Sequence, residues 1–216
     1  YSINDLIEKV RTEDRFGFEE IVFLLLTGRL PDKKELEEFN IMLSDERALP
    51  KDFFVDMILK APSPNIMNKM ARAVLSLYSY DEEAESQTPE HEVDTAISLI
   101  AKMPVIMVGA YETKRRCYDD RSLILHPLIK GQSTAENILS ILRADRKFTR
   151  EEAKLLDLML MLHAEHGGGN NSTFTCRVLT SSGTDPYSAY SAAIGSLKGP
   201  RHGGANHKVL EMQELI

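Results

Sequence analysis

The sequence has little cysteine, no long basic run and no long apolar run. Its two cysteines, Cys117 and Cys176, form no Cys-x-x-Cys pair, so we expect reduced thiols of a cytoplasmic protein rather than a disulfide framework. The longest basic run, Lys114–Arg116, is short, and the net charge is −7, which does not suit a nucleic-acid-binding surface. No apolar run reaches the roughly 20 residues that cross a bilayer, so we expect no membrane partner.

The two ends of the chain carry few of the usual terminal signals. The sequence starts at Tyr1 without methionine or a signal-like segment, and it stops at Ile216 inside a helical pattern that has no cap. We therefore expect a fragment that is incomplete at both ends.

Signals for strands are almost absent, whereas signals for helices recur along the chain. No run of alternating β-branched residues and no Asn-Gly or Asp-Gly hairpin turn occurs. Capping boxes at Ser133-x-x-Glu136 and Thr149-x-x-Glu152 each precede an apolar stripe at helical spacing. The sequence predicts an all-α, multi-helical fold of about ten helices with no significant sheet.

Proline, glycine and apolar runs predict where individual helices lie. Ser63–Pro64 and Thr88–Pro89 each resemble a helix start with proline at the first helical position. Pro104 should break or kink the helix that contains it. The run Phe18–Leu26 is apolar nearly all round, which predicts a buried helix, and Gly28 should end it.

The segment from His163 to His207 differs from the rest of the chain. It holds four of the six histidines and eight of the twelve glycines. Histidine exchanges protons near neutral pH, and glycine lets the backbone approach a ligand closely. His163 and His166 stand three residues apart at the end of a predicted helix, and three glycines follow. The segment therefore predicts a polar site on a helical scaffold.

Three kinds of chemistry are compatible with this segment. A metal site could use His163, Glu165, His166 and His202, but the His-Glu-x-x-His spacing of zinc hydrolases is absent. Phosphate binding by the glycines lacks both a Gly-x-Gly-x-x-Gly match and a following Gly-Lys-Ser/Thr. In a carbon–carbon bond-forming or acyl-transfer site, neutral histidines would donate hydrogen bonds to carbonyl oxygens while a carboxylate removes a proton.

Two runs in the segment carry a family resemblance. They are HAEHGGGNNSTF at His163–Phe174 and GPRHGGAN at Gly199–Asn206. With Thr184–Ser188 and Leu24–Pro31, they closely resemble the citrate synthase family, and the resemblance covers the whole chain.

The resemblance implies an all-helical homodimer that joins acetyl-CoA to oxaloacetate and hydrolyses the citryl-CoA intermediate. Such an acyltransferase needs no metal and no other cofactor, since acetyl-CoA is a substrate. By resemblance, His202 hydrogen-bonds the thioester carbonyl and stabilises the enolate oxygen. His166 and Asn170 match positions that hold oxaloacetate, and His163 supports the same pocket. Nothing in the motifs assigns a role to His207 or His91.

The resemblance also implies a domain division and an absence. Residues 1–198 would form most of an amino-terminal large domain, and residues 199–216 a hinge turn and the first helix toward a small domain. The hinge glycines are Gly199, Gly203 and Gly204. By resemblance, the family's second catalytic histidine, aspartate base and carboxylate-binding arginines follow the Gly199–Gly204 turn, and we expect them beyond Ile216. Asp185 is no substitute for the base, because it fits a helix cap before Pro186.

We therefore expect this polypeptide alone to be inactive. Two alternatives stay open: a 2-methylcitrate synthase that uses propionyl-CoA, and a non-catalytic helical dimerisation module.

Overall fold

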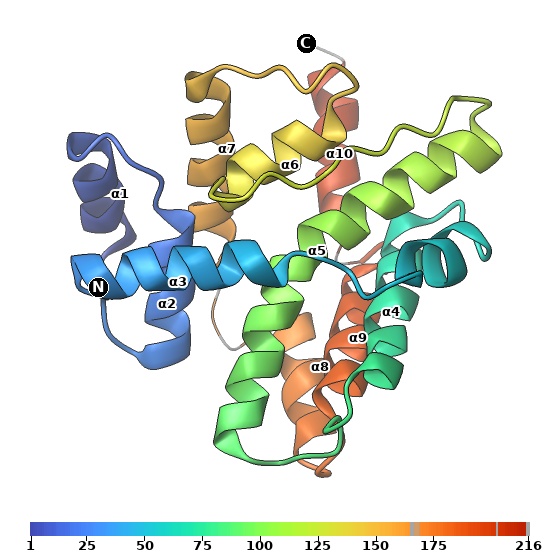
Figure 1. Ribbon diagram of the computed structural model, residues 1–216, viewed down its shortest axis with the longest axis horizontal. Helices are drawn as coiled ribbons and strands as arrows, with labels where there is room; N and C mark the ends of the chain where they lie inside the picture. The colour runs from blue at the N-terminus through green and yellow to red at the C-terminus, as the bar shows by residue number, and fades with distance from the viewer. Residues whose placement is uncertain (165–166, 168, 202, 215–216) are drawn as a thin grey trace. The chain divides into compact units, whose positions relative to one another are not determined.

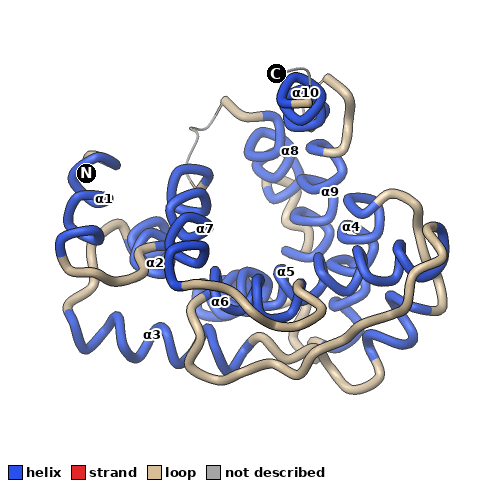
Figure 2. Tube along the Cα trace, turned by 90° about the horizontal axis from the view of Figure 1, so that it is seen from above, coloured by secondary structure: helices blue, strands red, loops and turns tan. Residues whose placement is uncertain are grey.

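The fold is helical throughout the part of the chain that is described. The computed structural model describes residues 1–164, 167, 169–201 and 203–214. Within these ranges there is no strand (Figure 2), so the predicted all-α class is confirmed. In chain order the helices are α1 (Ile3–Thr12), α2 (Phe18–Thr27), α3 (Lys33–Glu46), η1 (Phe54–Leu59), α4 (Ile66–Leu77), η2 (Tyr78–Tyr80), α5 (Pro89–Tyr118), α6 (Thr134–Leu142), α7 (Arg150–His163), α8 (Asn171–Thr180), α9 (Pro186–Leu197) and α10 (Gly204–Gln213) (Figure 1).

The helices group into two compact units. Unit 1 consists of Tyr1–Leu49, Ile97–Val108 and Ile124–His166, and unit 2 of Pro50–Ala96, Gly109–Leu123 and Gly167–Ile216. Helix α5 contributes to both units.

The core of unit 1 is organised around α2, which takes part in two apolar clusters. Neighbouring residues Ile21 and Val22 belong to different clusters, since successive helical residues point about 100° apart. This explains why α2 is apolar nearly all round. The first cluster contains Leu6, Val10, Ile21 and Met161. The second contains Val22, Phe39, Leu43, Ile97 and Ala101.

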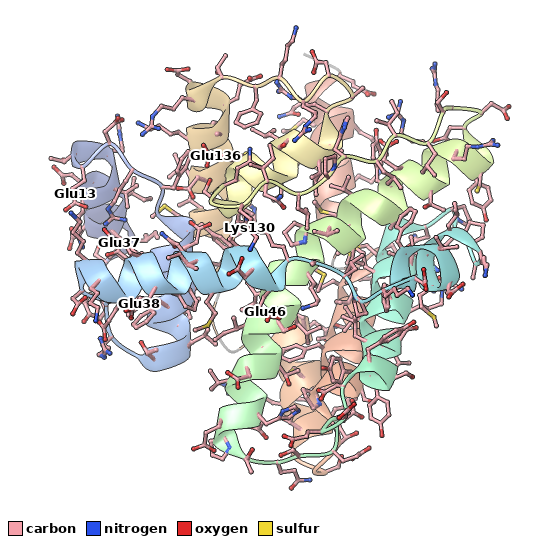
Figure 3. All side chains as sticks on the ribbon, viewed as in Figure 1. Glu13, Glu37, Glu38, Glu46, Lys130 and Glu136 are labelled. Atoms are coloured by element: carbon pink, nitrogen blue, oxygen red, sulfur yellow. The ribbon has the colours of Figure 1, made fainter. Side chains whose placement is uncertain are left out.

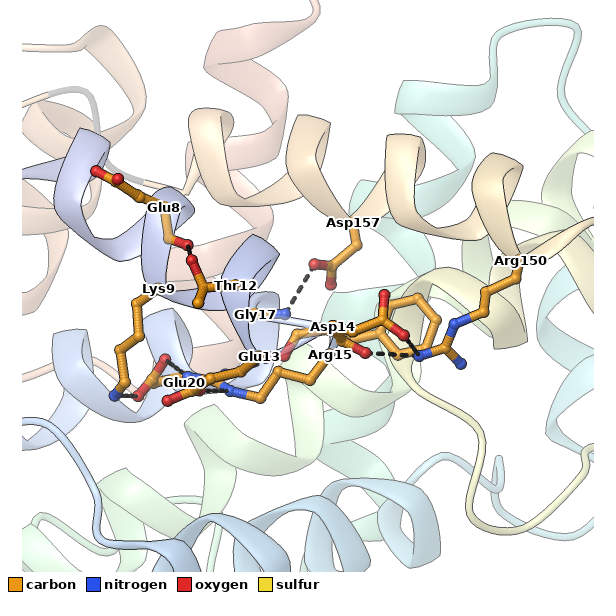
Figure 4. A network of polar contacts seen from close by, with 11 residues as sticks. Glu8, Lys9, Thr12, Glu13, Asp14, Arg15, Gly17, Glu20, Arg150 and Asp157 are labelled. Carbon is orange, nitrogen blue, oxygen red and sulfur yellow. Dashed lines mark hydrogen bonds and ion pairs between the residues drawn. The ribbon is translucent and has the colours of Figure 1, made fainter.

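The predicted burial of Phe18–Leu26 is only partly right, because α2 buries two charged residues. Leu25 is 50% exposed, whereas Glu19 and Glu20 are buried. Glu20 accepts hydrogen bonds from Lys9 Nζ at 2.9 Å and Arg15 Nη2 at 2.7 Å (Figure 4). Buried carboxylates are tolerated when charged donors reach them, and both donors precede α2 in the chain.

A carboxylate on α7 accepts hydrogen bonds from the start of α2. Asp157, 2% exposed, accepts a hydrogen bond from the backbone N–H of Gly17 at 2.8 Å (Figure 4) and another from the N–H of Phe18 at 3.1 Å. An anion here satisfies amides that the helix cannot bond itself. Burial nevertheless raises the pKa of Asp157 to about 6, because desolvation outweighs the two hydrogen bonds. Gly17 allows the approach, since a Cβ there would lie 2.7 Å from Met161 Sδ.

Unit 2 is built around α9, which packs against both α4 and α8. The buried faces of α9 carry the small residues Ala189 and Ala193, which let helices approach closely. The start of α4 differs from the prediction. Its N-cap is Asn65, whose side chain accepts the Asn68 N–H at 2.8 Å, so Pro64 precedes the cap instead of opening the helix.

Helix α5 starts as predicted but passes through its proline. Thr88 caps the helix and Pro89 is its first residue, while Pro104 lies inside it. Pro104 removes one backbone donor, at a usual cost of about 3 kcal/mol, yet the helix is not broken. Among the described helices, α5 is long and apolar enough to cross a membrane, but 56% of its apolar segment is buried inside the structure. Core helices of soluble proteins can be equally long and apolar, so the length of α5 is weak evidence for a membrane span.

Candidate active site

The candidate site begins at the end of α7. His163 is the last residue of this helix, and its Nδ1 lies 2.7 Å from the carbonyl oxygen of Met159 one turn earlier. Because a carbonyl can only accept, Nδ1 is the donor in this contact. The imidazole itself is exposed in unit 1. Glu165 and His166 lie outside the described residues.

A second group of candidate residues lies at the start of α8 in unit 2. Gly167 has φ of +81°, a left-handed conformation that suits glycine. Asn170 is the N-cap of α8, and its Oδ1 accepts hydrogen bonds from the N–H of Ser172 at 3.0 Å and its Oγ at 2.7 Å. The side chain of Asn170 therefore caps α8.

The third part of the site is the turn between α9 and α10. The Gly203 N–H donates to the carbonyl oxygen of Gly199 at 3.0 Å. A Cβ at Gly203 would lie 1.9 Å from the carbonyl oxygen of Leu197, whereas one at Gly204 would meet nothing closer than Pro200 Cβ at 3.8 Å. The turn thus has no room for a side chain at position 203, whereas a Cβ fits without a clash at position 204.

Topology brings Asn170 and this turn to one end of unit 2. Helices α8 and α9 pack side by side and are joined by a short loop, so they form an antiparallel hairpin (Figure 1). The start of α8 and the end of α9 therefore lie at the same end. His202 is outside the described residues, as is the side chain of His207. His163 belongs to unit 1.

Two other residues weighed from the sequence have structural contacts. The side chain of Asp185 accepts the Ser188 N–H at 2.8 Å as the N-cap of α9, as predicted. His91 Nε2 lies 3.2 Å from Asp81 Oδ2, which also accepts a hydrogen bond from the Tyr187 hydroxyl at 2.7 Å.

The described residues do not assemble a metal site. No group of three or more His, Cys, Asp or Glu side chains among them is placed to hold an ion. Glu165, His166 and His202, three of the four side chains of the metal alternative, lie outside this part of the chain. Cys117 and Cys176 are both free thiols, and burial raises the pKa of the Cys176 thiol.

The sequence matches known proteins along its whole length. A family model described as "Citrate synthase, C-terminal domain" matches residues 1–216. The chain belongs to the citrate synthase family. "Citrate synthase 2" of Bacillus subtilis is 38% identical over 215 residues, which make up 98% of this chain and 54% of that protein. "2-methylcitrate synthase 2" of Corynebacterium glutamicum is 34% identical over 221 residues, covering 100% of this chain and 54% of that protein.

A solved structure agrees with this assignment. The crystal structure of citrate synthase from Pyrobaculum aerophilum superposes with a TM-score of 0.79 at 30% sequence identity, covering 94% of this chain and 50% of that chain. The chain thus spans about half the length of the citrate synthases and 2-methylcitrate synthases it matches. The predicted placement of the chain in an amino-terminal large domain stays a prediction. So does the predicted division at residues 198 and 199.

Sequence reasoning missed the ionic groups buried in unit 1. Asp157, Glu19 and Arg47 are each at most 5% exposed. Asp157 sits in an apolar stripe of α7, where a lone carboxylate is a signal for a buried polar contact. Its partners on α2 are about 140 residues away in sequence, so no local pattern identifies them.

Proposed function

We propose that the protein is a cytoplasmic acyltransferase that condenses an acyl-CoA with oxaloacetate, without a metal or redox cofactor. The observation that carries this proposal is the family match over residues 1–216, which include both histidine–glycine motifs. Because relatives include both citrate synthases and a 2-methylcitrate synthase, the acyl group is acetyl or propionyl. Acetyl-CoA is the principal proposal, as the resemblance implies.

The proposed chemistry follows from what each motif offers. His202 donates a hydrogen bond to the thioester carbonyl oxygen and stabilises the charge that develops on it as the enolate forms. Such a bond accelerates the reaction because it strengthens in the transition state. His166 and Asn170 hold oxaloacetate, and His163 supports the pocket. The cap bonds to Asn170 Oδ1 fix the amide plane at the start of α8, which supports a positioning role.

We propose that Gly199, Gly203 and Gly204 form a hinge between residues 1–198 and a smaller domain that begins with 199–216. The tight approach of Gly203 to the Leu197 carbonyl supports a defined turn at this point. Hinges concentrate large changes of backbone angle in a few residues, and glycine accepts such changes at the least steric cost.

The reaction should be detected with the protein expressed from its complete gene. We expect citrate and free CoA from oxaloacetate and acetyl-CoA, or 2-methylcitrate from propionyl-CoA, and the ratio of the two rates identifies the acyl group. A polypeptide limited to these 216 residues should form neither product, since the resemblance places the aspartate base elsewhere. A complete gene product that dimerises but forms no product would favour the dimerisation module. Citrate from the 216-residue polypeptide, shown free of host enzyme, would disprove its predicted inactivity.

We also propose a homodimer, supported by α8. This helix buries none of its residues within the described structure, and Phe174 and Val178, one turn apart, are 62% and 50% exposed. A helix with an uncovered apolar face usually packs against another surface.

Phe174→Glu should therefore convert the dimer to monomer in sedimentation velocity. The matched control Met42→Glu, which changes an exposed apolar residue of α3, should leave the dimer intact. A wild-type protein that is monomeric at all concentrations contradicts the dimer.

A further inference from the structure

Unit 1 contains a cavity that the proposed reaction does not use. Its volume is about 820 Å³, within the usual range for small-molecule sites. The walls come from the segment between α1 and α2, from α2 and α3, from the segment before α6, and from the first turns of α6 and α7. Figure 3 labels Glu37, Lys130 and Glu136, which lie on three of these walls.

A buried arginine forms part of the cavity lining. Arg47 is 2% exposed, and within the described structure its guanidinium makes one hydrogen bond, from Nη1 to the carbonyl oxygen of Gln132 at 2.6 Å. Burial lowers the pKa of Arg47, while Glu19 and Glu136 oppose this shift. The group stays charged, because arginine does not deprotonate in proteins. Its remaining N–H groups can donate hydrogen bonds to a ligand in the cavity.

The same end of the cavity carries three acceptors that a ligand could reach. Glu19 Oε1 accepts the Thr134 N–H at 2.6 Å, and Glu136 Oε2 accepts the Ser133 N–H at 2.8 Å. Each carboxylate has a second oxygen with no hydrogen bond among the described residues. Gln132 Oε1 is buried and also has no partner there. A buried acceptor without a donor is costly, so this end of the cavity favours a ligand that donates hydrogen bonds.

Three other cations of the lining are already paired, whereas the exposed Glu37 has no ion pair among the described residues. Arg15 pairs with Glu20 at 2.7 Å, Arg150 with Asp14 at 3.4 Å, and Lys130 with Asp45 at 2.6 Å. The ligand therefore need not bring a charge to balance them. The apolar residues of the lining, which could pack against C–H groups of a ligand, are Phe16, Leu36 and Ile41.

We propose that this cavity binds a neutral, hydroxyl-rich small molecule, a sugar or polyol. Hydroxyl groups both donate and accept, so neighbouring hydroxyls can accept from Arg47 while they donate to Glu19, Glu136 and Gln132. The carboxylates of an organic anion cannot donate to the three acceptors, and they would face Glu19 and Glu136. An ammonium ion has no acceptor for Arg47 and would face its charge. The site goes beyond the proposed acyl transfer and does not depend on it.

The test uses ¹⁵N-labelled protein titrated separately with D-glucose, maltose, citrate and putrescine. We expect the amide signals of Gly131, Gln132 and Thr134 to shift and to saturate at millimolar glucose or maltose, with no saturable response to citrate or putrescine. Gln132→Met removes the unpartnered acceptor without changing the charge, and it should weaken binding at least about fivefold. The matched control Glu38→Gln lies on α3 outside the cavity lining and should bind as the wild type does.

Each other outcome overturns the proposal. Saturable binding of citrate or putrescine in place of the sugars would assign the cavity to ions. Shifts that grow linearly, or that spread over the whole spectrum, would mean that neither sugar occupies a site. Unchanged sugar affinity in Gln132→Met, with a spectrum that shows an intact fold, would mean that the buried unpartnered acceptor does not bind the sugar, which contradicts the proposed recognition.

Discussion

Asp157→Ala should lower the free energy of unfolding by about 2–4 kcal/mol at pH 7, because it leaves one buried and one half-buried backbone donor without an acceptor. Those donors are the N–H groups of Gly17 and Phe18. They start α2, the helix that both apolar clusters of unit 1 share. Urea unfolding of the wild type and the variant measures the difference.

The cost of this substitution should depend on pH. The folded-state pKa of Asp157 is about 6, above the ordinary value of 3.8, so the native state binds the proton more tightly than the unfolded chain. The resulting stabilisation is complete below the unfolded pKa and is lost as the pH rises through about 6. Asp157→Ala should therefore cost about 2 kcal/mol more at pH 4.5 than at pH 7.

The control is an exposed carboxylate on the same helix. Glu151→Ala should change stability by no more than about 0.5 kcal/mol at either pH, as surface substitutions usually do. A cost for Asp157→Ala that is the same at both pH values, or smaller at pH 4.5, would show that burial does not dominate the ionisation of this group.

Gly203→Ala should be the most damaging small substitution in the α9–α10 turn. The added Cβ would lie 1.9 Å from the carbonyl oxygen of Leu197, and a backbone atom cannot swing aside as a flexible side chain can. Relief requires the turn to move, at about 1–3 kcal/mol for such overpacking. Because displacements of about 1 Å near reacting groups can cost about 10²-fold, kcat for citrate formation should fall about that far in the complete gene product.

Gly204→Ala is the matched control for this substitution. Its Cβ would meet nothing closer than 3.8 Å, and Gly204 is the first residue of α10, where alanine has the better helix propensity. The kcat should stay within about twofold of the wild-type value, and the free energy of unfolding should change by no more than about 0.4 kcal/mol. Equal losses in the two variants would mean that the close approach at Gly203 does not set the geometry of the turn.

Helix boundaries could be predicted from the sequence where a short-range contact fixes them. Thr149 and Glu152 form the capping box of α7 through bonds between residues three apart, and Asp185 caps α9 in the same local way. Prediction failed at Ser63–Pro64, because Asn65 offers a competing cap two residues later. Of the two outcomes predicted at Pro104, a break does not occur, because tertiary packing can sustain a helix through a missing hydrogen bond.

The contacts that hold unit 1 together could not be predicted from the sequence. Glu19 bonds to an amide 115 residues away, and Asp157 to amides 139 and 140 residues away. No periodicity encodes such pairs. The candidate site, by contrast, could be located from local motifs, because its glycines and histidines are concentrated in the two runs at His163–Phe174 and Gly199–Asn206.

The most direct test compares three histidine variants of the complete gene product in steady-state assays with oxaloacetate and acetyl-CoA. His202→Ala should lower kcat about 10²–10³-fold, as loss of an oxyanion donor does. His166→Ala should mainly raise KM for oxaloacetate, and His207→Ala, five residues after His202, should change neither constant by more than about twofold. Undiminished kcat in His202→Ala, or an equal loss in His207→Ala, would contradict the assignment of the site.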